Sequence, residues 1–317
     1  MNVIGRLRLR TACGARWSCI GDGPVTKRIA LILGAALLCS PAHASYTIMF
    51  ERNIDAEGGN EVGFRTYPTF DDLLANTNAG PFIFSPTDVS PVFNTTGLTY
   101  DGSRFILMFE RNIDAEGGNE VGFRTYPTFD DLLANTNAGD FVFSPTDVSP
   151  VFNTTGLTYD GSRYIMMFER NVDAEGGNEV GFRTYATFDD LLANNAEGPF
   201  VFSPTDISPF FDTTGLTYDG IRYTMMFERN VDAEGGNEVG FRTYATFDDL
   251  LANNAEGPFV FSPTDISPFF NTTGLSFNGP FAGGGGNGGA TPVPEPASLA
   301  LFGLALAGLM AARRRRA

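Results

Sequence analysis

The stretch FERNVDAEGGNEVGFRTYATFDDLLANNAEGPFVFSPTDISPFF at residues 168–211 decides the fold, because the chain repeats it. The same letters stand at residues 227–270, and the tetrapeptide that opens the stretch also begins at Phe50 and Phe109. The spacing between successive copies is always 59 residues. A fixed period in this range is typical of arrays, propellers and solenoids, in which each repeat is one structural unit. The sequence therefore predicts a protein made of four like units.

One repeat contains four expected strands. They follow one another at Gly156–Tyr159, Arg163–Glu169, Glu179–Tyr185 and Phe200–Phe202. The Asp160-Gly161 pair between the first two is a hairpin signal, and Thr187 to Asp190 can cap one helical turn. Four strands in 59 residues are the content of one blade of a β-propeller.

The phase of the repeat predicts how the chain closes. From Ser45 to Pro280 there are 236 residues, which is four periods of 59. This span begins with the second expected strand of a repeat and ends with the first, so Thr273–Phe277 can pair with Tyr46–Glu51. Closure removes exposed sheet edges, whereas an open solenoid needs unlike end caps. We therefore expect an all-β, four-bladed propeller. The last repeat differs from the one before it only on the closing strand and its approach, at Asn271, Ser276, Phe277 and Asn278.

The N-terminal residues have the pattern of a secretory signal. Lys27 and Arg28 precede the apolar run Ile29–Leu38, and the small-residue triplet Ala42-His43-Ala44 follows. This pattern predicts cleavage by signal peptidase after Ala44. A cytoplasmic extension is the alternative for the first residues. We expect four parts: an N-terminal extension and signal peptide at 1–44, a propeller at 45–280, a glycine-rich linker at 281–292 and a sorting segment at 293–317.

The C-terminal tail has three parts. Pro294, Glu295 and Pro296 precede the apolar stretch Ala297–Ala312, and Arg313–Arg316 follow. Sixteen residues of helix span about 24 Å, less than the ~30 Å of a hydrocarbon core, and the arginines favour the cytoplasmic side. This tail resembles the PEP-CTERM sorting signal of Gram-negative bacteria. The resemblance implies transient membrane anchoring by a C-terminal transmembrane helix, processing by an exosortase near the Pro-Glu-Pro motif, and delivery to the cell surface or extracellular matrix. An ordinary short membrane anchor is the alternative.

The composition of residues 45–280 excludes several classes of chemistry. This span has 11 arginines against 35 aspartates and glutamates, a net charge of −24, and no lysine, histidine, cysteine or tryptophan. Disulfides, zinc sites built on histidine or cysteine, histidine-dependent nucleophiles and Schiff-base lysines are therefore excluded there. So acidic a span repels phosphate backbones, and nucleic acid is not an expected partner.

Each repeat carries an acidic loop between its second and third expected strands. In the loop that runs from Asn53 to Glu61, oxygen-bearing side chains stand at positions 1, 3, 5 and 9, with glycine at position 6. Alternate oxygens can converge on a hard cation while the glycine permits a sharp turn, so the loop resembles the DxDxDG calcium loops. The candidate calcium ligands are Asn53, Asp55, Glu57, Glu61, Asn112, Asp114, Glu116, Glu120, Asn171, Asp173, Glu175, Glu179, Asn230, Asp232, Glu234 and Glu238.

The loops depart from the calcium pattern in ways that favour a second interpretation. Asparagine replaces aspartate at position 1, glutamate stands at positions 5 and 9, and Phe64 occupies position 12. A solvated acidic hairpin turn, with Glu61 paired to Arg52, is therefore the competing prediction.

The repeats bear on function through their sameness. The stretch Ile165–Leu192 is similar to blades of five-bladed furanosidase-like glycosidases, which implies hydrolysis by axial carboxylates. Such chemistry needs two carboxylates in different environments, and nearly identical repeats supply no distinctive acid, so we expect no enzymatic activity. Equal repeats favour several weak sites whose avidity exceeds each affinity. The expected function is multivalent binding of extracellular polysaccharide or another surface ligand. A furanosidase-like hydrolase and a purely structural matrix component are the alternatives.

Overall fold

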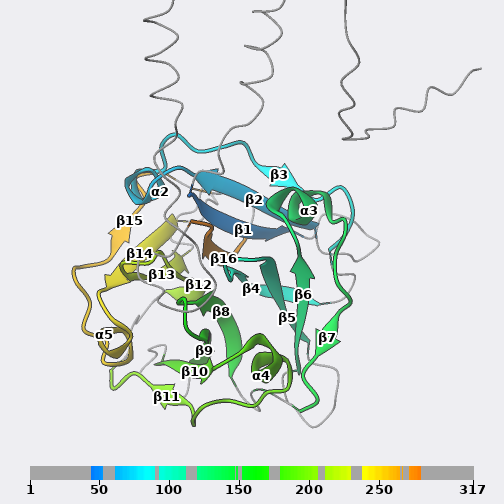
Figure 1. The fold of residues 1–317 in the computed structure, drawn as a ribbon. Helices are drawn as coiled ribbons and strands as arrows, with labels where there is room; N and C mark the ends of the chain where they lie inside the picture. Colours follow the sequence, from blue (N-terminus) through cyan, green and yellow to red (C-terminus); the bar gives the residue numbers. More distant parts are fainter. Residues whose placement is uncertain are drawn as a thin grey trace, which may run out of the picture. The chain divides into compact units, whose positions relative to one another are not determined.

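A computed structural model describes residues 44–52, 61–89, 93–111, 120–146, 148, 152–170, 179–205, 211–229, 238–264, 266 and 271–279. They belong to one compact unit, Ala44–Ala317. The described residues form four sheets of four strands each, which Figure 1 shows arranged around a common centre. The fold is all-β with a four-bladed propeller arrangement, as the period predicts.

Each sheet is one blade, with a helical turn after its third strand. Blade 1 contains, from the centre outwards, β16 (Asn271–Phe277), β1 (Tyr46–Arg52), β2 (Glu61–Tyr67) and β3 (Ile83–Phe84), with α2 (Phe70–Ala75). Blade 2 contains β4 (Asn94–Tyr100), β5 (Phe105–Arg111), β6 (Glu120–Tyr126) and β7 (Val142–Phe143), with α3 (Phe129–Ala134). Blade 3 contains β8 (Asn153–Tyr159), β9 (Tyr164–Arg170), β10 (Glu179–Tyr185) and β11 (Val201–Phe202), with α4 (Phe188–Leu192). Blade 4 contains β12 (Asp212–Tyr218), β13 (Tyr223–Arg229), β14 (Glu238–Tyr244) and β15 (Val260–Phe261), with α5 (Phe247–Leu251).

The two ends of the propeller sequence meet within blade 1. Strand β16 pairs antiparallel with β1, in a register that runs from Tyr46 opposite Phe277 to Glu51 opposite Asn271. The register shifts between Met49 and Phe50, and the other inner strands have an irregularity at the same place, as between Thr154 and Gly156. This β-bulge inserts one extra residue into each inner strand.

The inner strands pack closely around the axis. A Cβ atom placed on Gly97 of β4 would lie 3.1 Å from both the backbone nitrogen and the Cβ of Leu157 in β8. Glycines at the equivalent positions of the other inner strands meet the next leucine in the same way. Opposite inner strands, β4 with β12 and β8 with β16, also come into contact. Glycine is therefore required where the four strands converge.

The hydrophobic core lies between blades rather than inside one sheet. In β5, Ile106 belongs to a buried cluster with Phe168 of blade 3, whereas Leu107 belongs to a buried cluster with Phe64 of blade 1. The second strand of each blade is therefore covered on both faces, which explains why it is apolar along its whole length.

The helical turn begins where the sequence predicts. In α4, the Thr187 side chain accepts a hydrogen bond from the backbone nitrogen of Asp190 at 3.1 Å and donates one to its carboxylate at 2.6 Å. The strands match the predicted ones to within a few residues; the inner strand is longer at its start, Asn153–Tyr159 rather than Gly156–Tyr159. The bulge lies in the added part, where Gly156 interrupts the alternation that marks a strand.

Several predicted segments lie outside the described residues. These are the signal segment before Ala44, the linker at 281–292 and the sorting segment at 293–317, with Pro294, Glu295 and Pro296. Among the residues that the structure describes, no helix has both the length and the apolar character needed to cross a membrane. Ala42 lies outside as well, while Ala44 is the first described residue.

Candidate functional site

The predicted calcium loops are described only at their last position. Residues 53–60, 112–119, 171–178 and 230–237 lie outside the described residues, and with them the first three candidate ligands of each loop. The fourth candidates, Glu61, Glu120, Glu179 and Glu238, begin β2, β6, β10 and β14. Glu179 forms an ion pair with Arg170 of β9, which is the pairing that the acidic-hairpin alternative predicts. The described part of the chain holds no group of three or more acidic, histidine or cysteine side chains able to bind a metal ion.

Four glutamates lie near the axis, one in the second strand of each blade. They are Glu51, Glu110, Glu169 and Glu228. Each accepts two hydrogen bonds from a threonine in the inner strand of the next blade; Glu110 Oε2 is 2.6 Å from the backbone nitrogen of Thr154 and 2.7 Å from its hydroxyl. The other three pairs have distances between 2.6 and 2.7 Å. The glutamates therefore join neighbouring blades.

The same threonines make a closed ring of side-chain contacts around the axis. Thr154 Oγ1 lies 2.9 Å from Thr96 Oγ1 of the preceding inner strand. The equivalent contacts, at 2.8 to 3.0 Å, join Thr155 to Thr213, Thr214 to Thr272 and Thr273 to Thr95. A threonine hydroxyl has a single hydrogen, and that of Thr154 is donated to Glu110. Thr96, the extra residue of the bulge, is therefore the donor to Thr154.

Burial governs the protonation of the four glutamates. Removal from water raises the pKa of Glu110 above its ordinary value, although the two hydrogen bonds from Thr154 act in the opposite direction. The pKa values of Glu51, Glu169 and Glu228 are raised for the same reason. The four carboxylates share one kind of environment, which differs from the unlike pair that glycoside hydrolysis requires.

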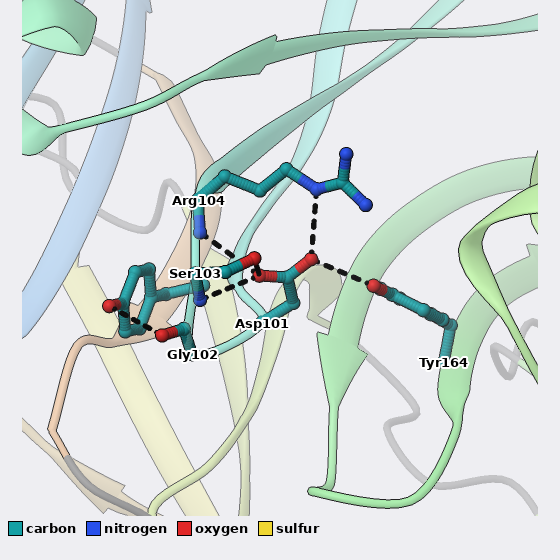
Figure 2. A network of polar contacts seen from close by, with 6 residues as sticks. Asp101, Gly102, Ser103, Arg104 and Tyr164 are labelled. Carbon is teal, nitrogen blue, oxygen red and sulfur yellow. Dashed lines mark hydrogen bonds and ion pairs between the residues drawn. The ribbon is translucent and has the colours of Figure 1, made fainter. Parts of the chain in front are cut away.

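A second network joins the blades at the turn between the first and second strands (Figure 2). Asp101 accepts hydrogen bonds from the backbone nitrogen and hydroxyl of Ser103 at 2.9 and 2.7 Å, and from the backbone nitrogen of Arg104 at 3.0 Å. Its other oxygen accepts from Arg104 Nε at 3.0 Å and from the hydroxyl of Tyr164, in the next blade, at 2.9 Å. Burial alone would raise the pKa of Asp101, but these donors outweigh it and hold the pKa below its ordinary value. Burial and the Asp101 carboxylate raise the pKa of Tyr164, which therefore stays a hydrogen-bond donor.

The tyrosine–aspartate contact recurs at two further junctions and changes at the fourth. Tyr223 donates to Asp160 at 3.0 Å, and Tyr46 donates to Asp219 at 2.6 Å. At the remaining junction, between blades 1 and 2, the repeat places Asn278 and Phe105, so the carboxylate and the phenol hydroxyl are missing together. Asn278 instead accepts hydrogen bonds from Ser45, at the start of the described chain.

Two grooves lie at equivalent positions between blades. The groove between blades 3 and 4 has a volume of about 340 Å³ and is lined by Arg163, Phe182, Thr184, Glu197 and Phe247, among others. The groove between blades 4 and 1 has a volume of about 370 Å³, and its lining contains the residues at the same repeat positions, Arg222, Phe241, Thr243, Glu256 and Phe70. Each groove thus combines a cation, a carboxylate, a hydroxyl and aromatic rings.

An arginine lies over an aromatic ring in each groove. The Arg163 guanidinium carbon is 4.6 Å from the centre of the Phe247 ring, and that of Arg222 is 5.4 Å from the centre of the Phe70 ring. Arg163 also pairs with Asp160 at 3.3 Å, which fixes its stem while its side chain stays 35% exposed. The aspartate of the blade junction therefore positions the cation of the groove.

The groove carboxylate comes from a loop that differs between the two halves of the propeller. The backbone nitrogen of Glu197 donates to the Thr184 carbonyl at 2.9 Å, and in blade 2 the equivalent donor to Thr125 is Gly139, also at 2.9 Å. Glu197 thus takes the place of a glycine, and Glu256 does so in blade 4. The loops keep the 59-residue period because blades 3 and 4 lack one residue earlier in the loop and have one more after the glutamate.

Reasoning from the sequence missed both the axial ring and the grooves. The glutamates of the ring were counted with the acidic loops, since each stands two residues before one. The change from Asn-Thr-Asn-Ala-Gly at 76–80 to Asn-Asn-Ala-Glu-Gly at 194–198 was the available signal for the grooves, because it is a difference between the pairs of repeats that places a carboxylate.

The fold defines the chain as a four-bladed propeller with binding grooves between its blades. Its tail gives the more particular assignment: residues 292–316 match the PEP-CTERM protein-sorting motif. The motif implies export, surface or membrane-associated sorting, and processing by an exosortase. None of the curated proteins matches this sequence.

Solved structures with some likeness to this chain are arabinan-degrading enzymes. They include an endo-arabinase from Bacteroides thetaiotaomicron, with 13% identity, coverage of 69% of this chain and 80% of that chain, and a TM-score of 0.33. A GH43 endo-arabinanase from Bacillus licheniformis has 9% identity, coverage of 74% and 77%, and a TM-score of 0.31. An arabinanase from Bacillus subtilis has 11% identity, coverage of 74% and 78%, and a TM-score of 0.30. Likeness at this level carries no argument about activity.

Proposed function

We propose that this chain is a cell-surface or extracellular-matrix protein that binds exopolysaccharide at several places through the grooves between its blades. The observation that carries the proposal is the recurrence of one groove, with the same cation, carboxylate, hydroxyl and rings, at two successive junctions. The sorting motif at 292–316 supports it, because an exported protein meets polysaccharide outside the cell.

The groove chemistry suits a sugar ring. Sugars present hydroxyls along their edges and apolar C–H groups on their faces, and each groove offers charged hydrogen-bonding groups beside an apolar wall. In the groove between blades 3 and 4, Glu197 can accept and Arg163 can donate, while Pro199 and Val201 supply apolar surface. Volumes of about 340 and 370 Å³ stand at the small end of the ~300–1,000 Å³ range of ligand sites, as expected for a short segment of a polymer.

The charge of the propeller restricts the polysaccharide. Residues 45–280 carry 11 arginines and 35 acidic residues, so an approaching polyanion is repelled. The ligand class that fits is a neutral polysaccharide rather than one rich in uronic acids or sulfate.

Two grooves on one rigid ring make binding bivalent. When one groove holds a chain, the second meets the same chain at a high effective concentration, and avidity can exceed the single-site affinity by about 10²–10⁴-fold. Weak individual sites therefore suffice to hold the protein in a polysaccharide matrix.

The enzyme alternative lacks support from the axial carboxylates. Glu51, Glu110, Glu169 and Glu228 have the same partners, and each is engaged by a threonine of the next blade. A retaining or inverting hydrolase needs one acid and one nucleophile or base whose environments differ. We accordingly propose a binding protein with no hydrolytic activity.

The test is binding of the purified full chain to neutral and acidic polysaccharides, with two exposed groove residues changed. Glu197→Ala and Glu256→Ala should each lower apparent affinity for a neutral polysaccharide by about tenfold or more, nearly as far as the double variant, because either change removes bivalency. Asp88→Ala, an exposed acidic residue outside both grooves, is the control for charge and should leave binding unchanged.

Three other outcomes would count against the proposal. Failure to bind any neutral or acidic polysaccharide would favour the purely structural alternative. Binding that is unaffected by both glutamate changes would remove the grooves as the site. Release of reducing sugar from furanoside polysaccharides would favour the hydrolase.

A further inference from the structure

The turn between the first two strands is interrupted in blade 1, where the two ends of the propeller sequence meet. By the 59-residue period, Asn278 corresponds to Asp101 and Ser45 corresponds to Arg104. In the continuous turn of blade 2, the backbone nitrogen of Asp101 donates to the Arg104 carbonyl at 3.2 Å, and the Arg104 nitrogen donates to the Asp101 side chain at 3.0 Å. The interrupted turn therefore has to be held without a covalent connection.

Asn278 and Ser45 reproduce the hydrogen bonds of that turn. The backbone nitrogen of Asn278 donates to the Ser45 carbonyl at 3.0 Å. In return, Asn278 Oδ1 accepts from the backbone nitrogen of Ser45 at 2.6 Å and from its hydroxyl at 2.9 Å. Ser45 is thus held by three hydrogen bonds at the first residue after the predicted cleavage point.

The residue before Ser45 lies in a crowded position. A Cβ atom placed on Gly279 would lie 2.6 Å from the Cβ of Ala44. The corresponding glycine of the continuous turn, Gly102, has nothing within 4 Å of such an atom. The incoming and outgoing segments therefore approach each other closely at Ala44 and Gly279, and removal of Ala44 relieves this contact.

We infer that Asn278 is the binding site for the α-amino group of Ser45 that cleavage after Ala44 sets free. An α-ammonium group has three N–H donors, and its hydrogen bond to an amide oxygen is charge-assisted and stronger than that of a peptide N–H. The inference uses the predicted cleavage point and is independent of the proposed polysaccharide binding.

The replacement of aspartate by asparagine at this position follows from the order of events. In the continuous turns the aspartate is neutralised by Arg104, Arg163 or Arg222, but the repeat places Phe281 at the corresponding position after Asn278. Before cleavage the Ser45 nitrogen is a neutral amide, so an aspartate here would be a part-buried carboxylate with no cation. Asparagine accepts equally from a peptide N–H and from an ammonium group, and it serves the chain before and after processing.

The test compares two forms of the chain that both end at Ala317. One begins at Ser45 and the other retains residues 42–44, and each is made with and without Asn278→Asp. At pH 6.5 the α-amino group is protonated, since its ordinary pKa is about 7.7–8.0. The substitution should raise the melting temperature of the form that begins at Ser45, because a carboxylate then faces an ammonium group. It should lower the melting temperature of the longer form.

The opposite signs are what separate this site from a merely structural role for Asn278. The neighbouring charges of Asp219 and Arg222, near the Tyr46 hydroxyl, are the same in all forms and cancel in the comparison. Shifts of the same sign in both forms would overturn the inference. A second measurement needs no substitution: the α-amino group of Ser45 should titrate above ~8 in the folded chain, and titration at the value of an unstructured peptide would also overturn it.

Discussion

The carboxylate of Glu110 in blade 2 holds Thr154 in blade 3 by two hydrogen bonds, at 2.6 Å from the backbone nitrogen and 2.7 Å from the hydroxyl. These residues are 44 positions apart and lie in different sheets. The backbone N–H of Thr154 lies beside the bulge, and Glu110 supplies its acceptor. Because the contact recurs at every junction, four glutamates connect all four blades through polar contacts near the axis.

Glu110→Ala should therefore lower the free energy of unfolding by about 2–3 kcal/mol, because it leaves a buried N–H and a buried hydroxyl without their charged acceptor. Urea denaturation followed by circular dichroism measures the change. Glu110→Gln keeps one acceptor oxygen and should cost less than the alanine variant. Equal stability of the wild type and both variants would show that the contact contributes nothing.

The four raised glutamate pKa values predict a specific dependence of stability on pH. In the folded protein Glu110 binds its proton more tightly than the ordinary value of 4.5 allows, because burial disfavours the charged form. The contribution of the protonated group is therefore fully present below pH 4.5, and it is lost as the pH rises through the raised folded pKa. Asp101, whose pKa is lowered, acts in a different range, since its contribution is lost as the pH falls through its folded pKa, below 3.8.

Glu110→Gln removes one of the four groups and should make the decline in unfolding free energy above pH 4.5 shallower than in the wild type. Urea titrations at closely spaced pH values measure the two slopes. Parallel slopes would mean that Glu110 has the same pKa in the folded and unfolded chain.

The architecture could be predicted from the sequence because it depends on period and phase. Phe168 and its copies fix the repeat, the Asp160-Gly161 pair marks a turn, and Thr187 marks the start of the helical turn. These are local signals, and the structure has a blade wherever they recur.

The site could not be predicted because it depends on contacts between repeats. Glu110 and Thr154 stand in separate expected strands, and only the packing of blade 2 against blade 3 brings them together. Glu197 was hidden for another reason: its loop loses one residue and gains another, so the period is unchanged while the residue that faces Thr184 changes from glycine to glutamate. Identical spacing therefore conceals a local change of geometry.

Tyr164→Phe should lower the free energy of unfolding by about 1.5–2 kcal/mol, because it removes a hydrogen bond to the ionised, part-buried Asp101 at 2.9 Å. Thermal or urea denaturation measures the loss. Tyr100→Phe is the matched control, since its hydroxyl donates to the Gly102 carbonyl at an exposed position and its removal should cost less than about 0.5 kcal/mol. Equal costs for the two variants would contradict a special role for the tyrosine–aspartate contact.

Calcium should leave the melting temperature unchanged. The Arg170 guanidinium already pairs with Glu179, the last candidate ligand of its loop, so a cation must displace it. A ligand at 100 times its dissociation constant adds ~2.7 kcal/mol per site, which corresponds to a rise of at least several degrees for a domain of this size. Melting curves in millimolar calcium, in magnesium and in chelator provide the comparison. A calcium-specific rise of that magnitude would restore the cation interpretation of the acidic loops.

Two glycine-to-alanine changes test how tightly the inner strands pack. A Cβ atom on Gly97 would lie 2.9 Å from the end of the flexible Met108 side chain, which can move, and 3.1 Å from the backbone nitrogen of Leu157, which cannot move without shifting β8. Gly97→Ala should therefore cost about 1–3 kcal/mol, the usual range for overpacking a close contact. Gly198 has open space around its Cβ position, so Gly198→Ala should change the unfolding free energy by less than about 1 kcal/mol and can raise it by restricting the unfolded chain. Urea denaturation of the two variants separates the effect of packing from that of adding a methyl group. If Gly97→Ala were as stable as Gly198→Ala, the inner strands would have room to separate, and the requirement for glycine at the axis would have to be given up.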